Sequence, residues 1–379
     1  MTSDRLRAII ELGAIAGNVR MTRSLINPNT KIMAIIKADG YGHGAIKVAE
    51  TALDNGADFL GVAIFEEGFE LRRANIDAPI LILGYTPPAH MENAILLGFR
   101  QTVFDLVTAR AISQAARRMG KMARIHIKLD TGMGRLGFLS SDQEREKSLS
   151  EICDIANLSD ISIEGVYTHF AMSDGPDMEY TNGQFEQFMN MTRLLDKASV
   201  NVLIKHCANS AAALADTKFH LDMVRLGVAM YGLDPSSHRP VRRLGYTPAM
   251  SLRAVVSFVK RVPQGVAVSY GCKFVTQRES VLATITAGYA DGYRRDLSCV
   301  GRVLIRGQYA PVAGTVCMDQ FVVDATGIDG VRAGDEVVLL GKQGKNEITA
   351  EEIADTCDTI NYEVVCGISK RVPRVYTAV

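Results

Sequence analysis

The sequence lacks an excess of charge of either sign. Lysine plus arginine and aspartate plus glutamate each number 42 among the 379 residues, so the formal net charge at pH 7 is zero. Nucleic acids and anionic membrane surfaces attract proteins with a basic surplus, and this sequence gives no reason to expect either partner. It also lacks an apolar run of the roughly 20 residues that a membrane span needs. The first ten residues, MTSDRLRAII, have no signal-peptide pattern.

Paired cysteines and metal-type histidine spacings are lacking as well. The seven cysteines are scattered, and no two of them form a CxxC pair. In a large chain such a set indicates reduced thiols, and we therefore expect a cytoplasmic protein. The seven histidines show no HExxH or similar spacing, so we expect no metal site. What is present is a chain of 47% hydrophobic residues that is long enough for two domains.

The first two thirds of the chain alternate between short apolar runs and stretches with helical periodicity. Leu12, Ile15, Ala16 and Val19, for example, follow the i, i+3, i+4, i+7 spacing of one helix face. Alternating strands and helices indicate βαβ units and a parallel sheet. We therefore predict an α/β fold with an N-terminal (β/α)8 TIM-type barrel in residues 1–244. The expected barrel strands are Ile32–Ile36, Phe59–Ala63, Ile80–Leu83, Gln101–Phe104, Arg124–Leu129, Ile163–Thr168, Val202–Lys205 and Val224–Gly227.

The texture of the sequence changes after residue 244. Short runs rich in β-branched residues follow, such as LRAVVSFVKRV and SVLATITAGYA, and glycine, proline or aspartate separates them. This pattern predicts a C-terminal, mostly β domain in residues 245–379. One helix is expected within it at Ala350–Thr356, with Thr349 as its N-cap.

Lys37 stands where the first apolar run ends, in the stretch IIKADGYGHG. A lysine at a strand end is usually a solvated tip. In a barrel, however, the carboxyl ends of the strands face the active site. An amine that an apolar strand partly desolvates has a lowered pKa and becomes a nucleophile or base, as in a Schiff base with a carbonyl cofactor.

The fifth and sixth expected strands end on further polar side chains. Arg135 lies in the glycine-rich turn DTGMGRLG, where it meets little steric competition. Lys128 alternates to the inside of the fifth strand, and a buried lysine needs a partner. His169, in YTHFAMSD, is either a satisfied core histidine, which is the commoner case, or part of a site.

A phosphate cradle is expected after the seventh and eighth strands, where barrel enzymes commonly bind phosphate. Asn209 and Ser210 open a helix there, and Gly227 and Val228 offer backbone N–H groups. A lysine and a phosphate cradle at one mouth suit an aldehyde-bearing phosphate ester, which is pyridoxal 5'-phosphate. Arg225 is a candidate partner for its ring nitrogen. Because arginine stays charged, it does not readily supply a proton, and the ring then suits simple proton exchange at one carbon.

Nine motifs in order resemble the alanine racemase family, which uses pyridoxal phosphate to interconvert L- and D-alanine for bacterial peptidoglycan. They are KADGYGHG, KLDTGMGRLGF, YTHFA, HCANSAA, VRLGVAMYG, VSYG, GYADGY, VCMDQ and INYEVVCGISKRVPRVY. The family fold is a (β/α)8 barrel followed by a β domain. The resemblance implies a homodimer in which the partner's C-terminal domain completes each site.

The resemblance also implies individual roles. Lys37 forms the internal aldimine with the cofactor and is one catalytic base, and Tyr270 of the other subunit is the second. The residues that match the phosphate-binding set are Tyr41, Ser210, Gly227, Val228 and Tyr362. Arg225 matches the ring-nitrogen partner, with His169 beside it. Arg135 matches the group that contacts the cofactor's phenolic oxygen and the substrate carboxylate.

The remaining matches concern the substrate and the entrance. Met318 matches a backbone donor to the substrate carboxylate; Cys317, Asp319 and Tyr289 line the mouth. Lys128 is carbamylated in many members and then orients the arginine that matches Arg135. There are two departures from the family pattern: Asp39 stands where asparagine is frequent, and Thr315 stands where many members have an entryway arginine.

Three rivals to an alanine racemase remain at this point. A broad-specificity or serine racemase shares the motifs, although Tyr362 and Tyr289 should narrow the pocket to a methyl group. A barrel-type amino-acid decarboxylase lacks VCMDQ and the tyrosine of SYG. A non-catalytic pyridoxal-phosphate carrier is a single barrel, and the C-terminal domain speaks against it. A racemase itself needs acid–base groups on both faces of the α-carbon.

Overall fold

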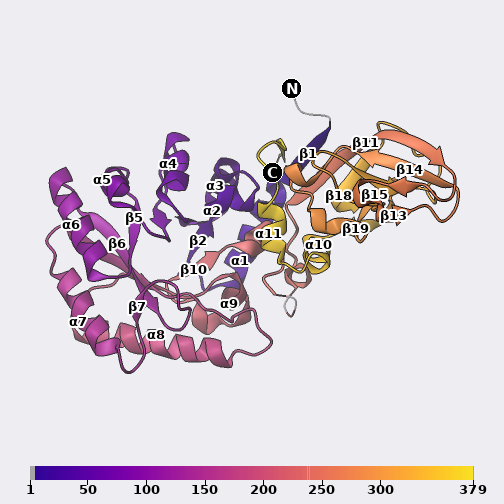
Figure 1. Cartoon of the computed structure of the whole chain (residues 1–379). Helices are drawn as coiled ribbons and strands as arrows, with labels where there is room; N and C mark the ends of the chain where they lie inside the picture. Colours follow the sequence, from indigo (N-terminus) through magenta and orange to yellow (C-terminus); the bar gives the residue numbers. More distant parts are fainter. Residues whose placement is uncertain (1–4, 237, 239, 379) are drawn as a thin grey trace. The chain divides into compact units, whose positions relative to one another are not determined.

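The computed structural model describes residues 5–236, 238 and 240–378, which fold into two compact units. The first, called here the barrel unit, comprises Ile15–Gly40 and Ala45–Thr247. The second, called the β unit, comprises the residues before Ile15, Tyr41–Gly44 and the chain from Pro248 onward. Figure 1 labels many of the helices and strands of both units.

The barrel unit contains, within the described residues, a ring of eight parallel strands in the order β10-β2-β3-β4-β5-β6-β8-β9. Each overlaps one of the predicted apolar runs, with ends that differ by at most two residues, which confirms the predicted α/β barrel. The ring is nearly closed, because Arg225 N–H donates to the Ala208 carbonyl and Asp222 N–H donates to that of Lys205, at 3.0 and 3.1 Å. The strands are β2 Lys31–Ile35, β3 Phe59–Val62, β4 Ile80–Ile82, β5 Arg100–Val103, β6 Ala123–Asp130, β8 Ile161–Tyr167, β9 Ile204–His206 and β10 Met223–Leu226, and the short β7 Phe138–Leu139 pairs with β6.

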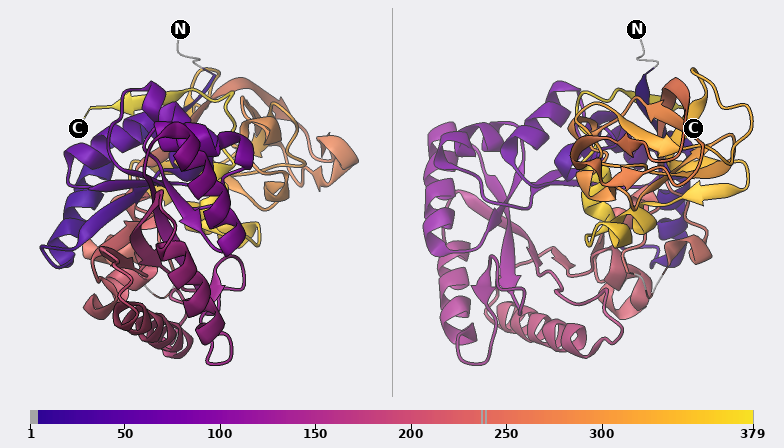
Figure 2. Two further views of the ribbon diagram at one scale, coloured as in Figure 1. Left: turned by 90° about the vertical axis from the view of Figure 1, so that its left-hand side faces the viewer. Right: turned by 45° about the vertical axis from the view of Figure 1, so that its right-hand side comes forward.

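Helices follow the barrel strands and lie outside the ring (Figures 1 and 2). Helix α6 illustrates the local cause: Asp105 accepts a hydrogen bond from Thr108 N–H at its start, and Gly120 ends it in the left-handed conformation. Its buried face presents Ala109, Ile112 and Ala116 to the strands. The helices are α1 Leu12–Leu25, α3 Ala45–Asp54, α4 Phe65–Arg73, α5 Pro88–Leu96, α6 Leu106–Met119, α7 Arg145–Ala156, α8 Glu179–Lys197 and α9 Ser210–Ala215, with short 3-10 helices at Thr217–Phe219, Val228–Tyr231 and Val241–Leu244.

The β unit is mostly antiparallel sheet, as predicted. Its central path runs β16-β15-β18-β11-β1-β20, and β14, β17 and β19 branch from it. Thr349 caps α10 by accepting a hydrogen bond from Glu352 N–H at 3.0 Å. The elements are β1 Leu6–Glu11, β11 Met250–Val262, β12 Ala267–Val268, β13 Phe274–Val275, β14 Ser280–Ile285, β15 Arg302–Ile305, β16 Gln308–Pro311, β17 Phe321–Asp324, β18 Glu336–Gln343, β19 Asn346–Ile348, α10 Ala350–Thr356, α11 Asn361–Cys366 and β20 Arg374–Thr377, with 3-10 helices at Tyr270–Cys272, Tyr289–Asp291 and Arg295–Leu297.

The N-terminal strand β1 is the main difference from the expected division of the chain. Residues 1–244 are expected from the sequence to form the barrel, whereas β1 lies in the β unit between β11 and β20. Leu6 pairs with Ala254 in the antiparallel ladder, and Ile9 pairs with Val375 in the parallel one. A six-residue apolar alternation predicts a strand, but it carries no information about which distant strand will pair with it.

None of the helices in the described part of the chain combines the length and the apolarity that crossing a bilayer requires.

Candidate functional site

The backbone directly after Lys37 forms a left-handed turn. Lys37 is exposed just beyond the buried strand β2, in the segment labelled α2 (Lys37–Tyr41). Ala38, Asp39 and Gly40 all have φ between 53° and 59°. Such a conformation costs roughly 1–2 kcal/mol for each residue with a side chain. The lysine is therefore attached to a backbone that its surroundings must hold in place.

Three hydrogen bonds hold this turn. Glu67 Oε1 accepts from Ala38 N–H at 2.7 Å, and Gly40 N–H donates to the Ile36 carbonyl at 2.8 Å. Asp39 Oδ1 accepts from Ala45 N–H at 2.8 Å, at the start of α3. Asparagine, which is frequent at this position in the family that the sequence resembles, has an equivalent Oδ1 acceptor. Asp39 can therefore make the same contact with Ala45 N–H.

Arg225 is buried in β10 with its guanidinium hydrogen-bonded on several sides. It donates to the carbonyls of Thr168 and Cys207 at 2.9 Å, and to Nδ1 of both His206 and His169 at 3.1 Å. Burial lowers the pKa of Arg225 to about 10, so the group is still charged near neutral pH. Burial and the Arg225 charge hold the pKa of both histidines well below the ordinary value. Both rings are therefore neutral acceptors at Nδ1.

A buried hydrogen-bonded series of side chains continues from Arg225 to Glu164. Because His206 accepts at Nδ1, its Nε2–H donates to Nδ1 of His126, 3.0 Å away. His126 Nε2–H then donates to Glu164 at 3.2 Å, and Arg100 pairs with the same carboxylate at 2.8 Å. Burial raises the pKa of Glu164, but hydrogen bonds from His126 and Arg100 outweigh it and lower the pKa to about 2.

These contacts define the tautomer of each ring in the series. His206, His126 and Glu164 are not among the site residues expected from the sequence. One signal was available: His126 alternates with Lys128 along β6, so the two side chains share the inner face of that strand.

Lys128 is buried, and its Nζ has no hydrogen-bond partner among the described residues. The ammonium lies over the Tyr167 ring, 4.8 Å from its centroid, and Arg225 lies over the same ring at 5.5 Å. Burial lowers the pKa of Lys128 well below its ordinary value, and the charges of Arg225 and Arg135 lower it further, whereas Asp130 opposes them. This amine is therefore neutral more readily than an exposed lysine.

The loop that carries Arg135 is shaped by Asp130. Its Oδ1 accepts from the backbone N–H groups of residues 132–134 at 2.9–3.1 Å. Gly137, with φ +133°, passes so close to β6 that a Cβ there would lie 2.6 Å from Asp130 N. Arg135 itself is exposed at this loop, and its charge reaches Lys128 and His169.

The ends of β9 and β10 bring a hydroxyl group and backbone N–H groups together in one compact set. Ser210 Oγ accepts from Gly227 N–H at 2.9 Å, and Val228 begins the following 3-10 helix. Asn209 caps α9 by accepting from Ala212 N–H at 3.0 Å. The chemistry of this set, a hydroxyl and backbone N–H groups beside a guanidinium, fits a phosphate ester with a polar ring.

Tyr41 and Tyr362 lie together in the β unit, with ring centroids 6.0 Å apart. Burial, and then the neighbouring Tyr362, raises the pKa of Tyr41. Gly42, with φ +77°, passes against α11, where a Cβ would lie 2.4 Å from the Val365 carbonyl oxygen. Arg374 Nε also donates to the Gly42 carbonyl at 3.0 Å. These contacts secure the Tyr41 segment within the β unit.

Two loops of the β unit carry the remaining predicted mouth residues and are joined through their backbones. Tyr289 N–H donates to the Cys317 carbonyl at 3.0 Å, and Ala290 N–H donates to that of Met318 at 3.0 Å. Gly288 allows this approach, because a Cβ there would lie 2.3 Å from either carbonyl oxygen. The side chains of Tyr289 and Met318 are 42% and 52% exposed, so they remain available beside the joined backbones.

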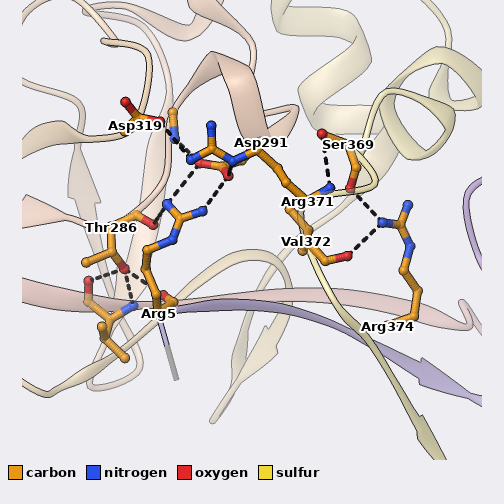
Figure 3. Close-up of polar contacts among 10 residues, drawn as sticks. Arg5, Thr286, Asp291, Asp319, Ser369, Arg371, Val372 and Arg374 are labelled. Atoms are coloured by element: carbon orange, nitrogen blue, oxygen red, sulfur yellow. Dashed lines mark hydrogen bonds and ion pairs between the residues drawn. The ribbon is translucent and has the colours of Figure 1, made fainter. Parts of the chain in front are cut away.

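An ion-pair cluster supports these loops (Figure 3). The fully buried Asp291 accepts from Arg5 at 2.6 Å and pairs with Arg371 at 3.0 Å. Arg371 also pairs with Asp319 at 2.7 Å, which links the predicted mouth residue to the buried carboxylate. Tyr270 lies on a neighbouring 3-10 turn of the same unit and is 72% exposed.

Comparisons with known proteins cover nearly the whole chain. Residues 10–235 match the family model "Alanine racemase, N-terminal domain", and residues 249–376 match "Alanine racemase, C-terminal domain". The chain is 46% identical over 370 residues to the alanine racemase of Desulfovibrio desulfuricans, with 97% of each chain covered. It is 44% identical over 370 residues to alanine racemase 2 of Caldanaerobacter subterraneus, covering 98% of this chain and 94% of that one.

Solved structures agree with these matches. An alanine racemase of Clostridium difficile superimposes with a TM-score of 0.94 at 40% identity, covering 100% of this chain and 97% of the other. The alanine racemase of Bacillus anthracis with bound L-Ala-P gives a TM-score of 0.91 at 36% identity, with 100% and 96% covered.

Proposed function

Because the chain belongs to the alanine racemase family, we propose that it interconverts L-alanine and D-alanine by a two-base mechanism with pyridoxal 5'-phosphate as cofactor. When bound, this cofactor draws electrons from the substrate's α-carbon and so makes the α-proton removable. The observation that carries the proposal is the position of Arg225 as a charged donor beside the Ser210–Gly227 donor set, at the barrel mouth that also bears Lys37. The biological role proposed is the supply of D-alanine for peptidoglycan.

The cofactor is proposed to bind through residues whose contacts are described above. Lys37 holds the aldehyde carbon, and Arg225 faces the ring nitrogen with His169 beside it. Because arginine only donates and stays charged, it binds the ring without acting as an acid. The proposed phosphate ligands are Tyr41, Ser210, Gly227, Val228 and Tyr362, and Asn209 supports the turn on which Ser210 lies.

Two bases on opposite faces of the α-carbon are proposed to move the proton. Lys37 of one chain serves one face, and Tyr270 of the second chain in a homodimer serves the other, because inversion removes a proton on one side and returns it on the other. Arg135 and the Met318 N–H bind the substrate carboxylate. Cys317, Asp319 and Tyr289 are proposed to line the entrance. In this scheme residues 1–244 supply most of the cofactor-binding groups, whereas residues 245–379 supply Tyr362 and complete the partner's site. The protein is proposed to act in the cytoplasm.

Lys128 is proposed to carry CO2 as a carbamate. Its buried Nζ lacks a hydrogen-bond partner within the described part of the chain, and its lowered pKa favours the neutral amine that attacks CO2. The new N–C bond releases one proton and leaves an anion. That anion would pair with Arg135, whose charge otherwise repels an ammonium at this position.

Incubation with L-alanine in D2O tests the function. We expect loss of the α-proton signal by NMR together with a decay of the optical rotation toward zero, and Lys37→Ala should abolish both. Release of CO2 would indicate a decarboxylase, and a carrier would give neither signal. A faster reaction with serine than with alanine would favour the broad-specificity alternative.

A further inference from the structure

The turn that carries Tyr270 is held by two reciprocal hydrogen bonds with the segment around Thr315. Thr315 Oγ1 donates to the Tyr270 carbonyl at 2.7 Å, and Ser269 Oγ donates to the Thr315 carbonyl at 2.6 Å. Ser269 Oγ also lies 3.4 Å from Cys317 Sγ. We call the pair of bonds the Ser269–Thr315 clamp. One bond of the clamp starts from Ser269, the residue before Tyr270, and the other ends on the Tyr270 carbonyl.

The backbone inside the clamp is strained. Ser269 has φ 64° and ψ −176°, a region that is adopted almost only by glycine. Gly271 and Cys272 follow with φ 72° and 47°. Such a conformation persists only where neighbouring contacts over-determine it, and in this turn the clamp supplies those contacts.

The segment on the Thr315 side of the clamp is buried and closely packed. Thr315 is 2% exposed, and Gly314, with φ +95°, passes so close that a Cβ would lie 2.6 Å from the Val268 carbonyl oxygen. Val268 belongs to a small apolar core cluster with Leu282 and Ala313. The Tyr270 side chain, in contrast, is 72% exposed. Closely packed backbone therefore supports the exposed phenol of Tyr270.

We propose that Thr315 and Ser269 are positioning residues that fix the direction of the Tyr270 phenol. The inference rests on the proposed role of Tyr270 as a base, because a base must come within hydrogen-bond reach of the proton it moves. In this chain a threonine occupies the place where many related sequences have an arginine, and its short hydroxyl reaches the Tyr270 carbonyl. The residue at this position thus contacts the backbone of the proposed base directly.

Matched substitutions at Thr315 test the clamp. Thr315→Val keeps the shape and removes the hydroxyl, whereas Thr315→Ser keeps the hydroxyl and removes a methyl. We expect kcat to fall about 10- to 100-fold in the valine variant, with a smaller change in KM, because a displacement of about 1 Å has effects of this size. The serine variant should retain most of the activity. The α-deuterium isotope effect should rise in one direction of racemisation only, since one of two bases is displaced.

A second readout does not depend on activity. Hydrogen–deuterium exchange of the full chain without added cofactor should be faster at residues 269–272 in Thr315→Val than in Thr315→Ser, with similar thermal midpoints. If Thr315→Val does not fold, Ser269→Gly replaces it, because glycine accepts the backbone angles while losing the hydroxyl. Equal exchange and equal isotope effects in the valine and serine variants would overturn the clamp. Full activity of Tyr270→Phe would instead refute the role of Tyr270, and the exchange result would still decide whether the clamp exists.

Discussion

At the residue scale, the barrel mouth concentrates cationic side chains whose protonation is set by burial. Arg225 stays charged, and its hydrogen bonds force the neighbouring His206 and His169 to be neutral acceptors. Lys128, unlike Arg225, has no hydrogen-bond partner in the described chain. It is buried, and the charges of two arginines, Arg225 and Arg135, act on it. Uncompensated buried charge is costly, so burial favours the neutral amine, which is the form that the proposed carbamylation requires.

Lys128→Ala should lower racemisation, and a small carboxylate such as acetate should restore part of it. The reason is that the added anion can pair with Arg135 in the space that the carbamate would fill. The measurement is the rate with and without acetate. The control is Lys205→Ala, because Lys205 on β9 is half-buried and already pairs with Asp196 at 2.8 Å. A 13C signal of a carbamate after exposure to labelled CO2 should be present in the wild type and absent from the alanine variant. An unmodified, fully active Lys128 would contradict the idea.

Glu164→Gln should change how stability depends on pH. Glu164 has a folded pKa of about 2 against an ordinary 4.5, so the folded state binds fewer protons than the unfolded state in this window. The stabilisation is therefore complete above pH 4.5 and is lost as the pH falls toward 2. We expect chemical unfolding to show a smaller loss of stability between these pH values in the glutamine variant. Identical slopes for the two proteins would show that the carboxylate is not paired in solution.

At the element scale, strained turns hold the two proposed bases. The turn after β2 places Ala38 and Asp39 in the left-handed region, and the turn before Tyr270 places Ser269 in a region typical of glycine. Each is held by side chains from other segments, Glu67 in the first case and Thr315 in the second. Strain of this kind is stored where the surrounding structure over-determines the backbone.

Ala38→Gly should stabilise the fold by up to about 1.5 kcal/mol. Removing the Cβ relieves roughly 1–2 kcal/mol of left-handed strain, and the greater freedom of glycine in the unfolded chain offsets about 0.4–1 kcal/mol of this. Denaturant unfolding measures the difference. Ala49→Gly, in the middle of the regular helix α3, is the matched control and should destabilise by about 1 kcal/mol or more. A loss of stability in Ala38→Gly would show that this turn is relaxed.

At the scale of the whole molecule, the chain crosses between its two units four times. It begins in the β unit with β1, returns there for Tyr41–Gly44, and ends there from Pro248 onward. The β unit therefore cannot form its sheet between β11 and β20 without the N-terminal residues. We expect the two family domains to be poorly separable by cutting the chain near residue 244.

Mixing two inactive variants tests whether sites are shared between subunits. Lys37→Ala and Tyr270→Ala are each expected to be nearly inactive as homodimers. In a mixed dimer one site receives both substitutions, and the other receives an intact lysine and an intact tyrosine. Racemisation should then reappear, with one working site per mixed dimer. Two affinity tags must first prove that mixed dimers form, and an absence of recovered activity in purified mixed dimers would falsify the shared site.

The sequence by itself determined the elements of the barrel. Strands such as Phe59–Val62 and Ile80–Ile82 are buried on both faces, so they appear as continuous apolar runs. Their order in the ring follows from the rule that consecutive strands of βαβ units lie side by side. It also determined that polar residues such as Lys37 and Arg225 fall at or near strand ends. These are local properties, because periodicity and burial are recorded in neighbouring residues.

The tertiary structure alone decided which distant groups meet. The pairing of β1 with β11 and β20 and the chain from His206 through His126 to Glu164 join segments far apart in sequence. The left-handed angles of Ala38 and Ser269 likewise arise from contacts with Glu67 and Thr315 rather than from the residues' own preferences. Hydrogen-bond partners, ring tautomers and backbone strain depend on packing across the fold, and no local pattern encodes them.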